Sequence, residues 1–108
     1  MATKVNLLMD QAATFSSTFT VLDVNDIPIN FSTYTTSSQM RKTYTSASSF
    51  TFTATGNSNG QITLTMNAAT TNTISAGRYV YDVEAVDSSG IKSRIVEGVI
   101  TVTPQVTR

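Results

Sequence analysis

The sequence predicts one all-β domain, an immunoglobulin-like β-sandwich of about seven antiparallel strands. Polar and apolar side chains alternate along most of the chain, which is the period of a strand. Short clusters of Gly, Asn, Asp, Ser and Pro divide the alternating stretches, as turns do. The length of 108 residues suits a single domain over 1–108. A partly open β-barrel gives the same pattern and is the alternative architecture.

The first third of the chain contains three expected strands. Apolar residues alternate in the opening segment, and a β-rich run follows at residues 18–24. The cluster Asn25-Asp26-Ile27-Pro28 ends that run, because Pro cannot donate to a ladder. A third strand is expected over residues 34–44.

The clearest hairpin spans residues 50–66. Its first strand alternates Phe and Thr, and the stretch 56–60 has the composition of a turn. The return strand places Ile62, Leu64 and Met66 on one face. Together with the next strand, this hairpin supplies the expected core: Phe50, Phe52, Ile62, Leu64, Met66, Tyr79, Tyr81 and Val83.

The last third predicts a short helical turn and two strands. Asn67 is placed to cap one turn of helix, and Gly77 opens a strong strand. Tyr79 in that strand is the candidate for a tyrosine corner, a hydroxyl that bonds back to the preceding backbone. A turn at 87–90 leads to a final strand over 91–103, where Gly98 marks a bulge or a close backbone approach.

The composition argues against an enzyme and against a bound cofactor. The chain has no Cys and no His, so the commonest nucleophile–base pairs and transition-metal ligands are absent. Asp82 and Glu84 share one strand face and resemble a carboxylate pair for acid–base chemistry. Outward charges on a strand more often pair with basic neighbours, for which Arg41, Lys42 and Arg94 are the candidates.

One stretch resembles the calcium-binding junction of cadherin repeats. The motif VLDVNDIPINF carries Asp23, Asn25 and Asp26, which are hard oxygen ligands suited to Ca²⁺. Asp87, in VEAVDSSG, is the further candidate ligand. The motif departs from the cadherin pattern at Ile27, and Asp and Asn beside Pro are also ordinary turn residues.

Charge and hydropathy restrict the classes of partner that the chain is expected to bind. Seven basic residues balance seven acidic ones, so the chain lacks the positive field that nucleic-acid binding requires. No stretch is long and apolar enough to span a membrane, and the first residues lack the pattern of a secretory signal. We therefore expect synthesis in a host cytoplasm, with no membrane or nucleic acid as partner.

The ends of the chain are expected to act as arms. Residues 1–9 and 104–108 flank the strands and are placed to reach a neighbouring molecule. Within them Val5, Leu7 and Val106 are the candidate contacts. Arg41 and Tyr44, from the expected third strand, are further candidates, and an exposed Tyr can stack on a sugar.

From residue 24 onward the chain resembles small immunoglobulin-like structural proteins of tailed bacteriophages, including cyanophages. The segments that carry the resemblance are DVNDIPINF, QMRKTY, GQITL, AGRYVYDVE and EGVITVTP. The resemblance implies a virion component of the tail, baseplate, neck or capsid decoration, bound in many copies to other virion proteins. The alternative is a cell-surface adhesion or carbohydrate-binding sandwich, with or without calcium.

Overall fold

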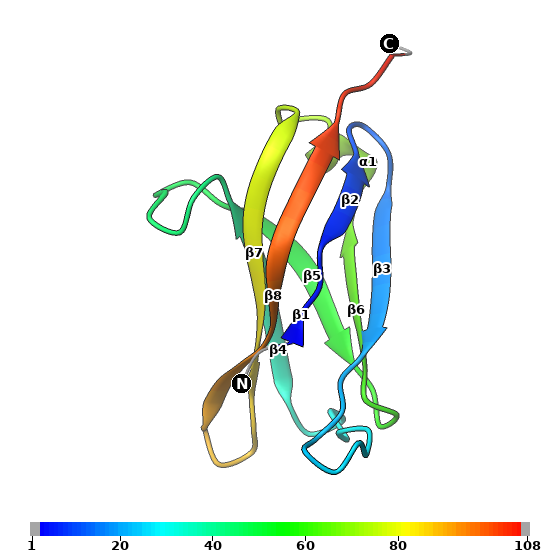
Figure 1. The fold of residues 1–108 in the computed structure, drawn as a ribbon, viewed down its shortest axis with the longest axis vertical. Coiled ribbons are helices and arrows are strands. Elements are labelled where there is room, and N and C mark those ends of the chain that lie inside the picture. The colour runs from blue at the N-terminus through cyan, green and yellow to red at the C-terminus, as the bar shows by residue number, and fades with distance from the viewer. Residues whose placement is uncertain (1–2, 107–108) are drawn as a thin grey trace.

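A computed structural model describes residues 3–106 and shows an all-β chain with one helical turn (Figure 1). The elements are β1 Thr3–Lys4, β2 Leu7–Asp10, β3 Phe15–Thr20, β4 Thr35–Arg41, β5 Phe50–Gly56, β6 Gln61–Met66, α1 Ala68–Thr71, β7 Gly77–Val86 and β8 Lys92–Thr103. No helix in this part of the chain is long and apolar enough to cross a membrane.

The strands form one curled sheet in the order β1-β8-β7-β4-β5-β6-β3, with β2 also paired to β8. The first residues of β5 pair with β4 and its last residues pair with β6, so β5 passes from one layer to the other. One layer holds β3, β6 and β5, and the other holds β4, β7 and β8, as in an immunoglobulin-like sandwich. Because β5 joins the layers, the sandwich also has the continuity of a half-open barrel.

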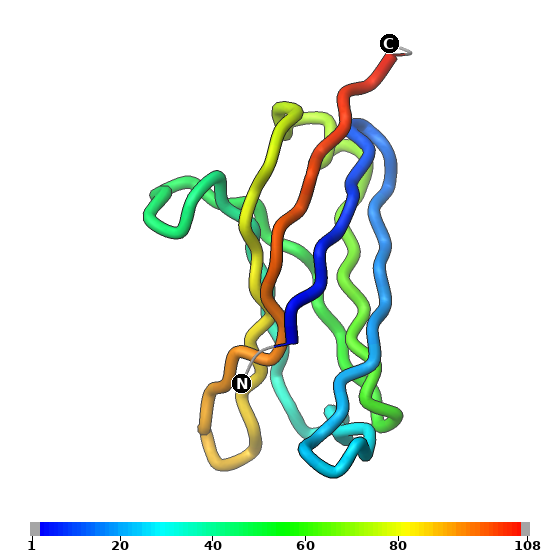
Figure 2. Tube along the Cα trace, in the orientation of Figure 1, coloured from blue at the N-terminus to red at the C-terminus, as the bar shows by residue number. Residues whose placement is uncertain are grey.

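The opening segment differs from the expected antiparallel pattern and from the expected arm. Both β1 and β2 pair with β8 in parallel, from Thr3 opposite Val96 to Asp10 opposite Thr103. Figure 2 shows this segment and the last strand running side by side. Thr3–Lys4 and Leu7–Asp10 are therefore part of the sheet, because both segments pair with β8. Residues 1–2 and 107–108 of the expected arms lie outside the described residues.

Gly98 explains how the opening segment reaches β8. A side chain at this position would run into the carbonyl group of Val5. The Val5 amide donates to the carbonyl of Glu97 (2.9 Å), and the Val5 carbonyl accepts from the Tyr81 hydroxyl (2.6 Å). Gly98 is thus a point of close backbone approach. The irregularity in the ladder lies elsewhere, where the β7–β8 register shifts after Val83.

The core lies between the two layers. Of the side chains expected there, Phe52, Ile62, Leu64, Met66, Tyr79, Tyr81 and Val83 are buried. Phe50 is only half-buried and packs against the edge of the core, because it is the first residue of β5 and follows the loop at 42–49 directly. Further core residues come from segments with weaker patterns: Met9, Phe15, Val21, Phe31, Met40, Ile74, Val96, Ile100 and Val102.

Two strands begin or end away from their expected positions. β3 covers residues 15–20 and not 18–24, since its ladder to β6 starts at Phe15 opposite Met66. β4 ends at Arg41, and residues 42–49 form a projecting loop. The register between distant strands, which local alternation does not reveal, sets both limits.

The connection between β6 and β7 matches its prediction. The Asn67 side chain accepts from the Thr70 amide (2.8 Å) and caps the single turn of α1. The Tyr79 hydroxyl donates to the carbonyl of Ser75 (2.7 Å), four residues upstream, which is the geometry of a tyrosine corner.

Candidate functional site

The carboxylates of Asp82 and Glu84 lie on the outer face of β7, and each has a basic partner on β8. Arg94 is 3.2 Å from Asp82, and Lys92 is 3.6 Å from Glu84. Partial burial raises the pKa of Asp82, and the nearby charges of Glu84 and Glu97 add to that rise, while Arg94 opposes it. Of the expected partners only Arg94 is used, since Arg41 and Lys42 are engaged elsewhere. The arrangement is that of a cross-strand ion-pair row.

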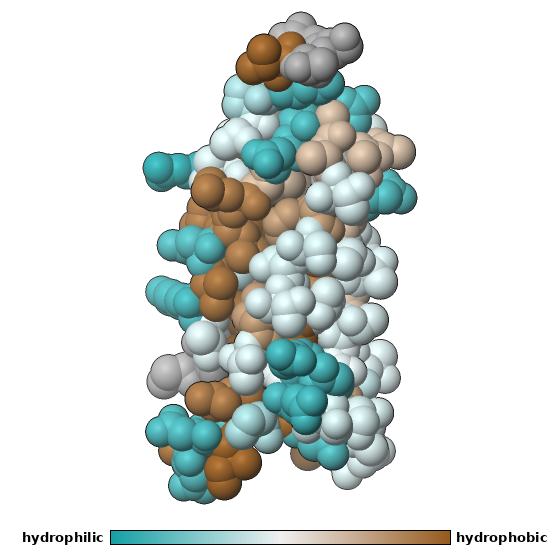
Figure 3. Space-filling model, turned by 90° about the vertical axis from the view of Figure 1, so that its right-hand side faces the viewer, coloured by the Kyte–Doolittle hydropathy of each residue, from teal (hydrophilic) through white to brown (hydrophobic). Residues whose placement is uncertain are grey.

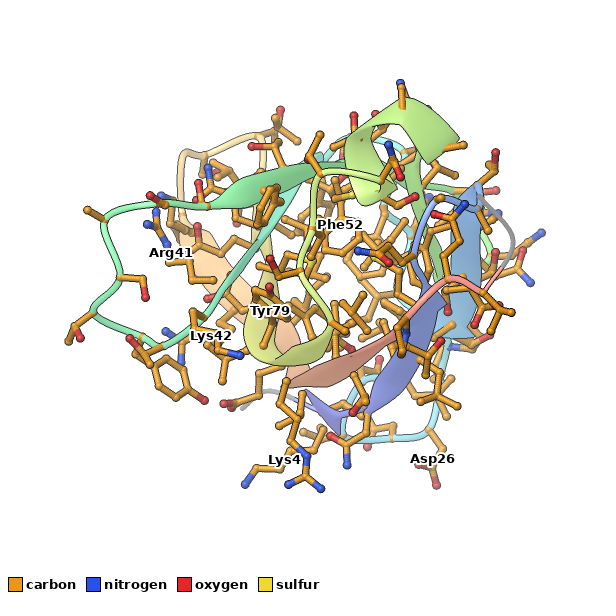
Figure 4. All side chains as sticks on the ribbon, turned by 90° about the horizontal axis from the view of Figure 1, so that it is seen from above. Lys4, Asp26, Arg41, Lys42, Phe52 and Tyr79 are labelled. Carbon is orange, nitrogen blue, oxygen red and sulfur yellow. The ribbon has the colours of Figure 1, made fainter. Side chains whose placement is uncertain are left out.

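Arg41 holds the loop at 42–49 in place. Its guanidinium donates to the carbonyl oxygens of Ser46 (2.7 Å) and Ala47 (3.3 Å) and to the side-chain oxygen of Gln39 (3.0 Å). The Lys42 ammonium group lies 4.8 Å from the centre of the Tyr79 ring. Figure 4 shows both basic residues at the base of the projecting loop.

A shallow groove runs between this loop and the outer sheet face. Its volume is about 270 Å³, and Tyr44, 69 % exposed, lines it from the loop. The other lining residues are Gln39, Arg41, Val80, Tyr81, Asp82, Glu84 and Arg94. Apart from Tyr44 and Val80, the exposed lining is polar and already engaged in internal contacts.

The four calcium candidates lie in loops at the lower end of the molecule. Asp23, Asn25 and Asp26 belong to the loop after β3, and Asp87 begins the β7–β8 turn. Among residues 3–106, no group of three or more Asp or Glu residues is arranged so that it could hold a metal ion. The Asp87 carboxylate accepts from the amides of Ser89 and Ile91 (both 2.9 Å). Such a carboxylate organises its own turn.

Asp23 organises its loop in the same way. Its carboxylate accepts from the amides of Asn25 (2.8 Å) and Ile27 (3.1 Å). Its own amide donates to the carbonyl of Ile27 (2.9 Å), and Leu22 forms a bridge with Pro28. The loop at 22–28 is therefore a small closed structure fixed by its own backbone.

This closed loop presents apolar side chains to solvent. Val24 is 99 % exposed and Ile27 56 % exposed, and Leu22 beside them is also exposed. Ile91, in the β7–β8 turn, is 63 % exposed at the same end, where the start of β4 pairs with the end of β7 (Figure 1). Figure 3 shows apolar colour at this lower end. We call these four residues (Leu22, Val24, Ile27 and Ile91) the apolar end.

The remaining candidate contact residues differ in how far they are buried. Val5 and Leu7 are partly buried against the core; the Val5 amide is bonded to Glu97, and Leu7 pairs with β8. Val106 is 93 % exposed beyond the end of β8. The apolar end was not among the expected contacts. Its signal in the sequence is a set of large apolar residues placed between turn-forming Asp, Asn and Pro.

Comparisons with known proteins bear on the fold. No protein-family model matches the chain, and no curated protein matches it. Among solved structures, an internalin-like protein of Listeria monocytogenes is similar, with a TM-score of 0.50, 18 % identity and coverage of 94 % of this chain. A family 123 glycoside hydrolase of Clostridium perfringens has a TM-score of 0.39 and 10 % identity over 97 % of this chain. The chain spans 28 % and 24 % of the lengths of these proteins.

Proposed function

We propose that this chain is a non-enzymatic assembly module that binds another protein through the apolar end. The observation that carries the proposal is the closed loop at 22–28, which holds Val24 and Ile27 out in solvent. Apolar side chains that gather at one end of a chain and are held in solvent by a closed loop are suited to contact a partner.

Burial of the apolar side chains would contribute favourable free energy to such a contact. Fully burying a Val or Ile side chain contributes about 1.5–3 kcal/mol. Binding usually loses part of this gain when a flexible loop must be ordered. Here the Asp23 carboxylate has already ordered the loop through the amides of Asn25 and Ile27. A partner with an apolar depression would therefore not lose part of this gain to the ordering of the loop.

The proposed partners are other proteins of a tailed-bacteriophage virion, in the tail, baseplate, neck or capsid decoration. This setting rests on the resemblance of residues 24 onward to small virion proteins. A neutral chain in which only 13 % of residues are charged also suits close packing among many copies.

The test is incorporation into particles. Particles released by the producing cells are purified on density gradients, and peptides of the chain are quantified against other particle proteins. We expect a fixed ratio for the wild type and loss of the double variant Val24→Asp/Ile27→Asp, whose thermal unfolding stays unchanged. Leu8→Asp, at an exposed apolar site on β2, is the control and should be incorporated. A wild-type chain missing from particles, or normal incorporation of the double variant, would refute the proposal.

A second candidate function, carbohydrate binding, has one observation in its favour. Tyr44 stands over the groove beside Gln39, Asp82 and Glu84, so an aromatic ring and planar polar groups line one depression. Titrations with neutral sugars, followed by NMR, test this reading. Shifts confined to the groove that disappear in Tyr44→Ala would support it, and no shifts at millimolar sugar would exclude it.

A further inference from the structure

The strand β3 is a free edge of the sheet. It is paired along its whole length with β6, from Phe15 opposite Met66 to Thr20 opposite Gln61. In an antiparallel ladder every second residue turns its amide and carbonyl away from the partner strand. On that side β3 has no strand partner among the described residues, because an open groove of about 460 Å³ separates it from β2.

The two edges of the sheet are protected to different degrees. The edge formed by β1 and β2 is short, is interrupted at residues 5–6 and carries Lys4 and Asp10. Charges and interruptions of this kind prevent edge-to-edge pairing. The edge at β3 is six residues long and carries no charge, no proline and no bulge. No residue of β3 itself opposes pairing with another strand.

The side chains of β3 suit pairing with a copy of themselves. Ser16, Thr18 and Thr20 are exposed on the outer face and continue a flat Ser/Thr surface across β6, where Thr18 and Thr63 share a hydrogen bond (3.0 Å). Phe19, on the inner face, is only partly buried, so a neighbouring strand would cover more of its ring. The net charge of the chain is zero, so two copies do not repel each other.

A two-fold axis through β3 lets the two copies form backbone hydrogen bonds and keeps the same face of the sheet on the same side in both copies. Every second residue of β3 turns its amide and carbonyl outward. When two copies of β3 pair in antiparallel orientation, each outward-turned residue must lie opposite an outward-turned residue of the other copy. The axis then passes through Ser17 or Thr18. In both registers outer-face residues meet outer-face residues, and the inner faces of the two copies stay on one side.

We propose that β3 is a homotypic interface, at which a second copy of this chain adds its own β3 in antiparallel orientation. The pairing joins the layers β3-β6-β5 of two copies into one sheet of double width. This interface lies along the side of the molecule, and β3 ends at Thr20, two residues before Leu22 of the apolar end. The proposal does not depend on the function proposed for that end.

Single cysteines provide the sharpest test, because the chain contains none. Residues directly opposite each other in an antiparallel pair are about 4.5–5.5 Å apart at Cα, which is within the range of a disulfide. Ser17→Cys and Thr18→Cys place a thiol near the two-fold axis, one for each register. We expect rapid covalent dimer formation by at least one of them under mild oxidation. Thr55→Cys, on the same Ser/Thr face but inside the sheet, is the matched control and should stay monomeric.

Mass measurement on the unmodified chain completes the test. Sedimentation should show a reversible dimer with a Kd on the order of 100 μM, since a single strand pair is a small interface. Thr18→Lys should weaken the dimer at least about tenfold, because it places like charges at the edge. Thr55→Lys should leave the dimer unchanged. A chain that stays monomeric at all concentrations, or cysteine cross-linking at Thr55 as fast as at Ser17 and Thr18, would overturn the proposal.

Discussion

A single hydroxyl group, that of Tyr79, holds the connection between β6 and β7 in place. Tyr79 is buried, and its hydroxyl donates to the carbonyl of Ser75 across the end of the β6–β7 connection. Removal of the hydroxyl leaves that carbonyl without its partner. We expect Tyr79→Phe to lower the free energy of unfolding by about 1–2 kcal/mol, measured by urea denaturation. Tyr44→Phe, at an exposed ring, should have no effect, and equal losses in the two variants would contradict this role.

Gly98 acts through the space that it leaves for the backbone of Val5. A methyl group at this position would displace residues 3–6 from β8. Gly98→Ala should therefore lower the unfolding free energy by about 1–3 kcal/mol. Hydrogen exchange should become faster at residues 3–10 and stay unchanged in the β5–β6 hairpin. Thr101→Ala, on the outer face of the same strand, is the control. Unchanged exchange in the opening segment would count against the close approach.

Asp82 makes stability depend on pH. Because burial and two neighbouring carboxylates raise its pKa above 3.8, the folded chain holds this proton more tightly than the unfolded chain. The resulting stabilisation is present below the unfolded pKa and is lost as the pH rises through the folded pKa. The stability of the wild type relative to Asp82→Asn should therefore fall with rising pH across this interval. The difference in stability is measured from the urea midpoints of the wild type and Asp82→Asn at a series of acidic pH values. A difference that increases with pH would contradict this assignment.

At the level of elements, the opening strand is part of the core. Met9 is 1 % exposed on the inner face of β2, while its neighbour Leu8 is 73 % exposed on the outer face. Met9→Ala should lower the unfolding free energy by about 2–5 kcal/mol, and Leu8→Ala by less than about 0.5 kcal/mol. Chemical denaturation of the two variants distinguishes a strand from an arm, since an arm would tolerate both changes equally.

Local alternation predicted the elements whose partners are close in sequence. The hairpin of β5 and β6 follows from the alternation of Phe and Thr around a Gly/Asn turn, and the cap at Asn67 follows from its own side chain. The limits of β3 and the parallel pairing of β2 depend on registers with β6 and β8, which lie far along the chain. Alternation is the same in parallel and antiparallel edges, so the sequence alone does not distinguish them.

The apolar end was missed for a related reason. Val24 ends a stretch that alternates like a strand, and Ile27 stands in a turn-forming cluster, so the pattern predicts strand and turn residues here and not an exposed contact. Their exposure results from the Asp23 carboxylate, which closes the loop before β4 begins. An oxygen-rich motif that resembles a calcium site therefore acts here as the internal support of an apolar loop.

For the whole molecule, the proposed contacts occupy separate regions. The apolar end lies at the lower tip, between β3 and β4 and at the β7–β8 turn, and the free edge of β3 lies along one side (Figures 1 and 3). One surface can therefore bind a different protein while the other pairs with a second copy. The many-copy assembly proposed above would use both surfaces at once.

Hydroxyl-radical footprinting of the chain, free and within purified particles, tests the central claim most directly. We expect Val24, Ile27 and Ile91 to lose reactivity in the particle, because a partner protein covers the apolar end, while Tyr44 keeps its reactivity. Reactivity that persists at the apolar end in the particle, or protection confined to the groove at Tyr44, would contradict the account.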